Sequence, residues 1–220
     1  MRKLLCGSVV PFAALCILAG CNGKLNGVKG SGTIKTEARE VAGFTSVSLE
    51  TMGKVTVRQT GKESLTVSAE DNLLPLLESR VVDHVLTLGT ANKADISPTK
   101  PIEFVIEVKN IEGLSVSGAG DIEVSGVQGK QLSVTLSGVG NVTVAGAADK
   151  LELKVSGVGH YNGEDFKTKQ ATVKSSGVGI AVVNASEQLD AEVSGVGSVE
   201  YIGSPKVNES VSGIGSVKKH

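Results

Sequence analysis

Residues 132–155 read Leu-Ser-Val-Thr-Leu-Ser-Gly-Val-Gly-Asn-Val-Thr-Val-Ala-Gly-Ala-Ala-Asp-Lys-Leu-Glu-Leu-Lys-Val. Apolar and polar residues alternate up to Leu136, the chain turns at Ser137-Gly138-Val139-Gly140, and alternation then resumes until a second Gly-containing turn. Period-2 alternation between Gly-rich turns is typical of β-strands, and the stretch carries no helical period. It therefore predicts two or three short strands in each repeat.

The motif Ser-Gly-x-Gly recurs along the second half of the chain, at steps of 20, 19, 20, 18 and 18 residues. Its copies start at Ser117, Ser137, Ser156, Ser176, Ser194 and Ser212. Such short strands cannot bury a face alone, but stacked coils can, because each coil pairs in parallel with its neighbours. The spacing predicts an all-β parallel solenoid with coils of about 18–20 residues.

Aligning the repeats gives columns of equivalent residues. We predict that the glycines are structural turn residues, needed for positive φ or close backbone approach. They are Gly118, Gly138, Gly157, Gly177, Gly195 and Gly213, and Gly120, Gly140, Gly159, Gly179, Gly197 and Gly215. We expect the apolar column between them to lie inside the coil; it consists of Ala119, Val139, Val158, Val178, Val196 and Ile214. The serines are interpreted as a hydrogen-bonding ladder, since catalysis needs one activated hydroxyl beside a base.

The N-terminus predicts export and lipidation. Residues 1–20 have a basic start and an apolar stretch too short to span a membrane stably. The ending Leu18-Ala19-Gly20-Cys21 resembles the lipobox of bacterial lipoproteins, which implies cleavage between Gly20 and Cys21 and acylation of Cys21. By resemblance to the Gram-negative sorting rule, Asn22 favours the outer membrane. A non-lipidated signal peptide is the alternative, and residues 21–43 are interpreted as the lipidated cysteine and a flexible tether.

Composition limits the function classes. Cys6 and Cys16 lie in the segment predicted to be removed, so the mature chain has no disulfide and depends on its core. Removing Arg2 and Lys3 leaves 20 basic residues from 22 against 23 acidic residues, a net charge of 20 − 23 = −3. Nucleic-acid binding requires a basic surface, and this net charge does not indicate one, so we exclude nucleic acid as a partner.

Residues 44–220 are predicted to form the β-helix domain, with irregular coils over 44–110 and regular coils over 111–220. The chain resembles a bacterial family described as putative auto-transporter adhesins with a head GIN domain, many of them lipoproteins. The resemblance rests on Phe44-x-x-Val47, Gly53-x-Val55-x-Val57, the stretch Ala69-Glu-Asp-Asn-Leu-Leu, and strands followed by Ser-Gly-Ala/Val-Gly. It implies an all-β, single-stranded right-handed parallel β-helix (solenoid) and an adhesive role, and it transfers no catalytic or binding residue.

Two other periodic folds fit less well. A calcium-binding β-roll needs an acid in each repeat, but the residue after the motif is acidic only at Asp121 among six copies. A left-handed hexapeptide helix requires coils of 18 residues throughout, and the steps of 19 and 20 do not allow this.

A carbohydrate-active β-helix enzyme or polysaccharide-binding protein is the rival function. The available acids, in predicted turns or loops, are Asp149, Glu164, Asp165 and Asp190, and no arginine follows Arg80. The histidines, His84, His160 and His220, have no metal-ligand spacing. We therefore expect no catalytic residue, metal or cofactor. The predicted function is that of a lipid-anchored adhesive, scaffold or binding module of the cell envelope, whose envelope or extracellular protein or polysaccharide partner is unidentified.

Overall fold

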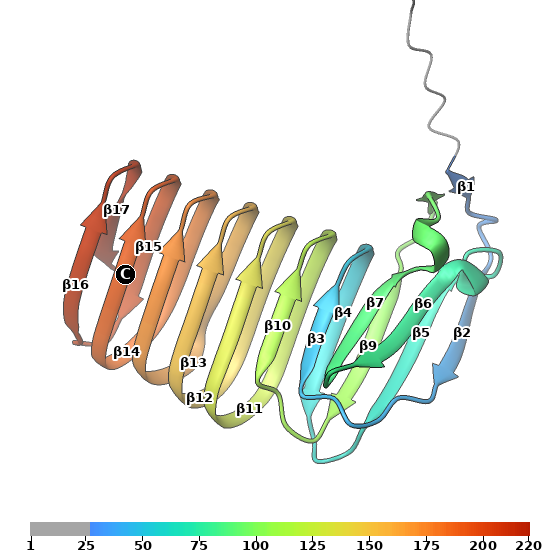
Figure 1. Cartoon of the computed structure of the whole chain (residues 1–220), viewed down its shortest axis with the longest axis horizontal. Helices are drawn as coiled ribbons and strands as arrows, with labels where there is room; N and C mark the ends of the chain where they lie inside the picture. The colour runs from blue at the N-terminus through green and yellow to red at the C-terminus, as the bar shows by residue number, and fades with distance from the viewer. Residues whose placement is uncertain (1–26) are drawn as a thin grey trace, which may run out of the picture.

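The computed structural model describes residues 27–220, which form a flattened β-solenoid with its coils side by side along one axis (Figure 1). These residues contain no α-helix, and two short 3-10 helices are present. Strand pairing between coils is parallel over most of the length. The fold is thus the all-β parallel solenoid that the repeat spacing predicts.

The regular part consists of eight strands that follow one another coil by coil. They are β10 (Gly113–Val116), β11 (Ala119–Leu136), β12 (Val139–Val155), β13 (Val158–Ser175), β14 (Val178–Val193), β15 (Val196–Ile202), β16 (Lys206–Val211) and β17 (Ile214–Lys219). Each coil rises on a first face, turns at Ser-Gly-x-Gly and descends on a second face. We call the line of these turns the turn edge, at the top of Figure 1. The chain returns along the opposite edge, around which β11 to β14 continue without a break.

Alternation along the strands sets the core. Leu132, Val134 and Leu136 are fully buried on the first face, and Val142 and Val144 are fully buried on the second. The residues between them point outward, as period-2 geometry requires. A narrow core of aliphatic side chains therefore runs between the two faces, because every coil contributes to it at matching positions.

Unequal coil lengths are absorbed at the opposite edge. Between β11 and β12 the register shifts between Val124 and Val127, and between β12 and β13 it shifts between Thr143 and Gly146. Both shifts lie beyond the second face, away from the turn edge. The turns themselves stay in register, with Val139 opposite Val158. The steps of 18 to 20 residues therefore reflect loops at one edge only.

The N-terminal part contains nine strands in a different spatial order. They are β1 (Val28–Lys29), β2 (Ile34–Arg39), β3 (Ser46–Leu49), β4 (Met52–Gln59), β5 (Ser64–Glu70), β6 (Leu77–Val82), β7 (Val85–Thr90), β8 (Ile96–Ser97) and β9 (Glu103–Val108). β3 and β4 form a coil that pairs in parallel with β10 and β11. The next strands outward are β7 and β9, which come later in the chain. Spatial order along the axis therefore departs from sequence order here.

Antiparallel strands close the N-terminal end of the core. β5 pairs antiparallel with β9 and β2, and β6 pairs antiparallel with β7. The 3-10 helix η1 (Leu74–Leu76) joins β5 to β6 and buries Leu73, Leu74 and Leu77 against the core. A second 3-10 helix, η2 (Ala91–Lys93), follows β7. The end of a solenoid exposes its core, and these elements cover it.

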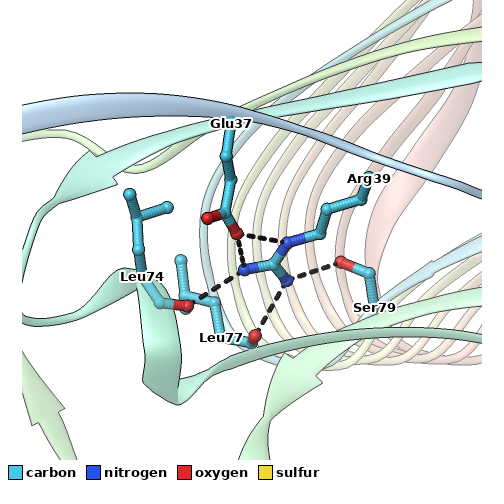
Figure 2. A network of polar contacts seen from close by, with 5 residues as sticks. All are labelled: Glu37, Arg39, Leu74, Leu77 and Ser79. Carbon is cyan, nitrogen blue, oxygen red and sulfur yellow. Dashed lines mark hydrogen bonds and ion pairs between the residues drawn. The ribbon is translucent and has the colours of Figure 1, made fainter.

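Arg39 ties the outermost strand β2 to this cap (Figure 2). Its Nη1 donates to Leu77 O at 2.8 Å and to Ser79 Oγ at 3.1 Å, and its Nη2 donates to Leu74 O at 2.9 Å. The Nε donates to Glu37 Oε1 at 2.7 Å. The guanidinium thus links β2 to the carbonyls of Leu74 in η1 and of Leu77 at the start of β6.

Glu70 holds the segment before β2 in place, although it is a buried carboxylate. Its oxygens accept hydrogen bonds from Gly32 N at 2.6 Å, Thr99 N at 2.8 Å, Thr99 Oγ1 at 2.5 Å and Lys100 N at 3.3 Å. Burial acts to raise the pKa of Glu70, but these hydrogen bonds outweigh it and hold the pKa below its ordinary value. Four donors therefore fix the chain near Gly30, where a Cβ would overlap the carboxylate.

The predicted tether is corrected by these contacts. Residues 28–39, interpreted as part of a flexible tether, form β1 and β2 instead. β1 pairs with β8, and Asn72 Nδ2 donates to Lys29 O at 2.8 Å. The Gly- and Lys-rich composition suggested flexibility, but long-range partners order the segment. Residues 40–43 of the predicted tether lead from β2 towards β3, and residues 21–26 lie outside the described residues.

We predict that Glu70→Gln lowers the thermal unfolding midpoint by several degrees at neutral pH, because one amide cannot accept from all four donors. The pKa of Glu70 is lower in the folded state than in the unfolded state. Its contribution to the free energy of unfolding is therefore full above the unfolded-state pKa and is lost as pH falls through the folded-state pKa. The two melting curves should therefore converge in acid. Glu164→Gln, at an exposed position, serves as the control in the same calorimetric series, and an equal loss in both variants would contradict the role of Glu70.

Candidate functional site

The turn edge repeats one hydrogen-bond pattern from coil to coil. Ser137 N and Gly138 N both donate to Val116 O, at 2.8 and 2.9 Å. Val139 N donates to Gly118 O at 3.0 Å. Equivalent bonds recur at every later copy of the motif, so each turn is anchored to the turn before it. The edge is therefore a continuous backbone ladder rather than a row of independent loops.

The predicted turn glycines all lie on this edge, at positions where backbone meets backbone. A Cβ on Gly138 would overlap Gly118 O, and a Cβ on Gly140 would overlap Gly120 O. Gly140 also has φ of 148°, a conformation that residues with a side chain rarely adopt. The same overlap is found at the remaining copies: Gly118, Gly120, Gly157, Gly159, Gly177, Gly179, Gly195, Gly197, Gly213 and Gly215.

The apolar column between the glycines faces solvent, and the expectation that it lies inside the coil is wrong. Val139 is 57% exposed, and Ile214 is 78% exposed. The reason is that strand alternation continues through the turn. With Leu136 inward and Gly138 and Gly140 against neighbouring backbone, the side chain at 139 has only the outward direction.

The serines also point outward and make fewer side-chain contacts than expected. Ser137 Oγ donates to Val116 O at 3.2 Å, and Ser117 Oγ donates to Leu49 O at 3.5 Å. At the other four copies only the backbone N–H of the serine is bonded to the preceding coil. The predicted hydroxyl ladder is therefore limited to the first two copies, and the backbone does most of the linking.

A short side-chain ladder that the sequence reading missed follows the second glycine. Asp121 Oδ1 accepts from Asn141 N at 2.8 Å, Asn141 Oδ1 accepts from His160 N at 3.3 Å, and His160 Nδ1 accepts from Ile180 N at 3.2 Å. Each side chain thus receives the backbone N–H of the next coil. His160 acts here as a hydrogen-bond acceptor, a structural role. The available signal was a polar residue after the motif in successive repeats.

The acids considered for catalysis do not form a paired site. Asp149 lies 2.8 Å from Lys169 Nζ, whose hydrogen bond and charge hold the pKa of Asp149 below its ordinary value. A general acid needs the opposite shift. Asp190 accepts from Gln188 Nε2 and Asn208 Nδ2 on the first face, and Glu164 and Asp165 are exposed at the opposite edge.

Two further histidines and four aromatic rings make contacts within the protein. His84 Nδ1 lies 2.8 Å from Gly43 O, and His220 Nδ1 lies 2.7 Å from Glu200 Oε2. Within residues 27–220, no three His, Cys, Asp or Glu side chains gather in a way that could hold a metal ion. The four phenylalanine and tyrosine rings that are fully buried are Phe44, Phe104, Tyr161 and Phe166. These rings cannot stack on a sugar from outside. Gly20 and Cys21 lie outside the described residues.

Stacked coils joined by a glycine-built edge define the chain as a parallel β-solenoid. A family model described as putative auto-transporter adhesin, head GIN domain, matches residues 43–205, and the chain belongs to this family. Among curated proteins, none matches the chain. Among residues 27–220, no helix is long and apolar enough to cross a membrane.

Several solved structures share this fold. A structure described as a putative adhesin from Bacteroides fragilis is 28% identical, with a TM-score of 0.73, over 88% of this chain and 100% of that one. One described as a putative lipid binding protein from Parabacteroides distasonis is 20% identical, with a TM-score of 0.59, over 88% and 99%. A putative adhesin from Parabacteroides merdae is 18% identical, with a TM-score of 0.53, over 88% and 98%. The last two show the fold alone.

We predict that Gly140→Val destabilises the protein by more than about 1 kcal/mol. A β-branched side chain is poorly tolerated at positive φ, and its Cβ would overlap the backbone of the neighbouring coil. Val139→Ala, one residue away but exposed, should change stability by no more than about 0.5 kcal/mol. Equilibrium denaturation of both variants beside the unsubstituted protein is the measurement. A neutral Gly140→Val together with a costly Val139→Ala would contradict the geometry of the turn edge.

Proposed function

We propose that this protein is an exported, lipid-anchored component of the bacterial cell envelope that acts without catalysis, as an adhesive, scaffold or binding module. Membership of the adhesin family supports an adhesive role. The lipobox-like Leu18-Ala19-Gly20-Cys21 supports anchoring through Cys21, and Asn22 supports the outer membrane of a Gram-negative bacterium. Several acyl chains on one cysteine give stable attachment, whereas a single chain binds only marginally.

The observation that carries the non-catalytic part is the repetition of the surface. Each coil from Ser117 onward presents the same turn to solvent in the same register. An enzyme site concentrates different groups at one place, whereas a repeated surface suits contact with an extended partner. Envelope or extracellular proteins and polysaccharides are partners of that shape, and a net charge of −3 on the processed chain does not favour nucleic acid.

The anchoring proposal predicts that Cys21→Ser abolishes incorporation of a labelled fatty acid and leaves the precursor uncleaved or the protein released from membranes. The measurement is metabolic labelling followed by gel analysis and membrane fractionation. Cys16→Ser, inside the predicted signal peptide, is the matched control and should label normally. Label that persists in Cys21→Ser would place the acylation elsewhere and overturn this part of the proposal.

A further inference from the structure

A straight line of exposed apolar side chains runs along the turn edge, and we call it the apolar ridge. It consists of Met52, Ala119, Val139, Val158, Val178, Val196 and Ile214, paired in that order from coil to coil. Val158, Val178 and Val196 are each about half exposed, at 49%, 47% and 49%. Strand spacing makes six intervals about 29 Å long. Contiguous exposed apolar surface in a soluble domain marks an interaction site.

From Ser137 onward, the two columns beside the ridge contain no acid, lysine or arginine. On one side, the serine column is uncharged from Ser117 to Ser212. On the other side, the column begins with the charged Lys54 and Asp121 and continues from Asn141 through His160, Ile180 and Ser198 without an acid, lysine or arginine. Ionic side chains are frequent elsewhere on both faces, so the turn edge from Ser137 onward is a distinct uncharged strip. Such a strip can leave water without desolvating an ion.

The backbone of the ridge is also suited to an environment poor in water. Val158 N donates to Gly138 O at 3.0 Å, and Val178 N donates to Gly157 O at 2.9 Å, with the same pattern along the edge. In lipid an unpaired backbone group is strongly unfavourable, which is why exposed loops normally stay out of it. Here the turns satisfy their N–H groups from coil to coil, so the strip can approach acyl chains.

The position of the chain start indicates what the ridge faces. One hollow of about 680 Å³ is lined by Asn92 and Lys93 of η2 and by Ser117 of the first turn, together with charged residues that include Glu50 and Arg80. β8 follows η2 and pairs with β1, and Figure 1 shows β1 at the same edge as the turns. Only five residues separate Gly27 from Cys21, a span of about 20 Å at most when extended. An acyl group on Cys21 would therefore lie within about 20 Å of Gly27, at the N-terminal end of the solenoid.

We infer that the apolar ridge rests on the lipid surface in which Cys21 is anchored, so that the solenoid lies along the membrane with its opposite edge outward. This inference rests on the anchoring proposed above. A second copy of the chain fits less well, because a strip about 29 Å long and one turn wide is far smaller than the roughly 800 Å² per partner of a stable interface. A row of side chains at one height matches a flat surface, where binding grows with the apolar area buried.

The test compares two sites on the same coil of the processed, full-length protein reconstituted into vesicles. A single cysteine replaces Val158 on the ridge or Lys167 on the opposite edge, and each carries the same nitrobenzoxadiazole label. The vesicles contain phosphatidylethanolamine and phosphatidylglycerol, with or without spin-labelled lipid as quencher.

The label at 158 should be quenched more strongly than the label at 167, by about twofold or more. Adding Val178→Asp and Val196→Asp, both at exposed positions, should remove the difference without changing the circular dichroism spectrum.

Each outcome decides the question. Equal quenching at the two sites, with fatty-acid labelling of Cys21 intact, overturns the ridge inference and leaves the anchoring proposal standing. If Cys21 carries no fatty acid, the processed protein is added to the same vesicles, and selective quenching at 158 supports the ridge contact while its absence overturns it. Disulfide-linked dimers of unlabelled Val158→Cys without vesicles, absent for Lys167→Cys, would show that a second copy covers the ridge.

Discussion

The close contact of glycine backbones at the turn edge is the constraint on which the rest of this structure depends. Gly138 lies against Gly118, and Gly140 lies against Gly120, with no room for a Cβ at either position. This proximity lets Val139 N reach Gly118 O and fixes each turn on the one before. Stacking of coils therefore starts from backbone geometry, and the apolar core then stabilises the spacing so defined.

The same constraint makes the two edges differ in the changes of sequence that they tolerate. The turn edge tolerates no change of length, so insertions collect at the opposite edge, where the register shifts after Val124 and Thr143. It also directs each residue between two glycines outward, whatever its polarity. The exposed valines are thus a consequence of the glycines, and their chemistry is free to serve contact with another surface rather than folding.

Much of the fold could be predicted from the sequence, because alternation and the recurrence of Ser-Gly-x-Gly both report strand geometry directly. The direction of Val139 could not be obtained from its hydrophobicity. Alternation counted through the turn from Leu136 predicts an outward side chain, but the assumption that apolar residues are buried overrode that count. At the N-terminal end, the placement of β7 and β9 beyond β3 and β4 depends on which strand edges remain free, and no local pattern records it. The carboxylate of Glu70, buried among four donors, likewise has no periodic signal.

The central claim is that glycine contact forces the apolar residue of each turn outward, and thiol reactivity tests it most directly. Val139→Cys and Val142→Cys place a thiol on either side of the turn glycine at 140, in the processed protein under native conditions. We expect the thiol at 139 to react with a water-soluble maleimide faster than the thiol at 142 by at least a factor on the order of ten, since only the latter needs an opening of the core. A slower reaction at 139 than at 142 would contradict the account.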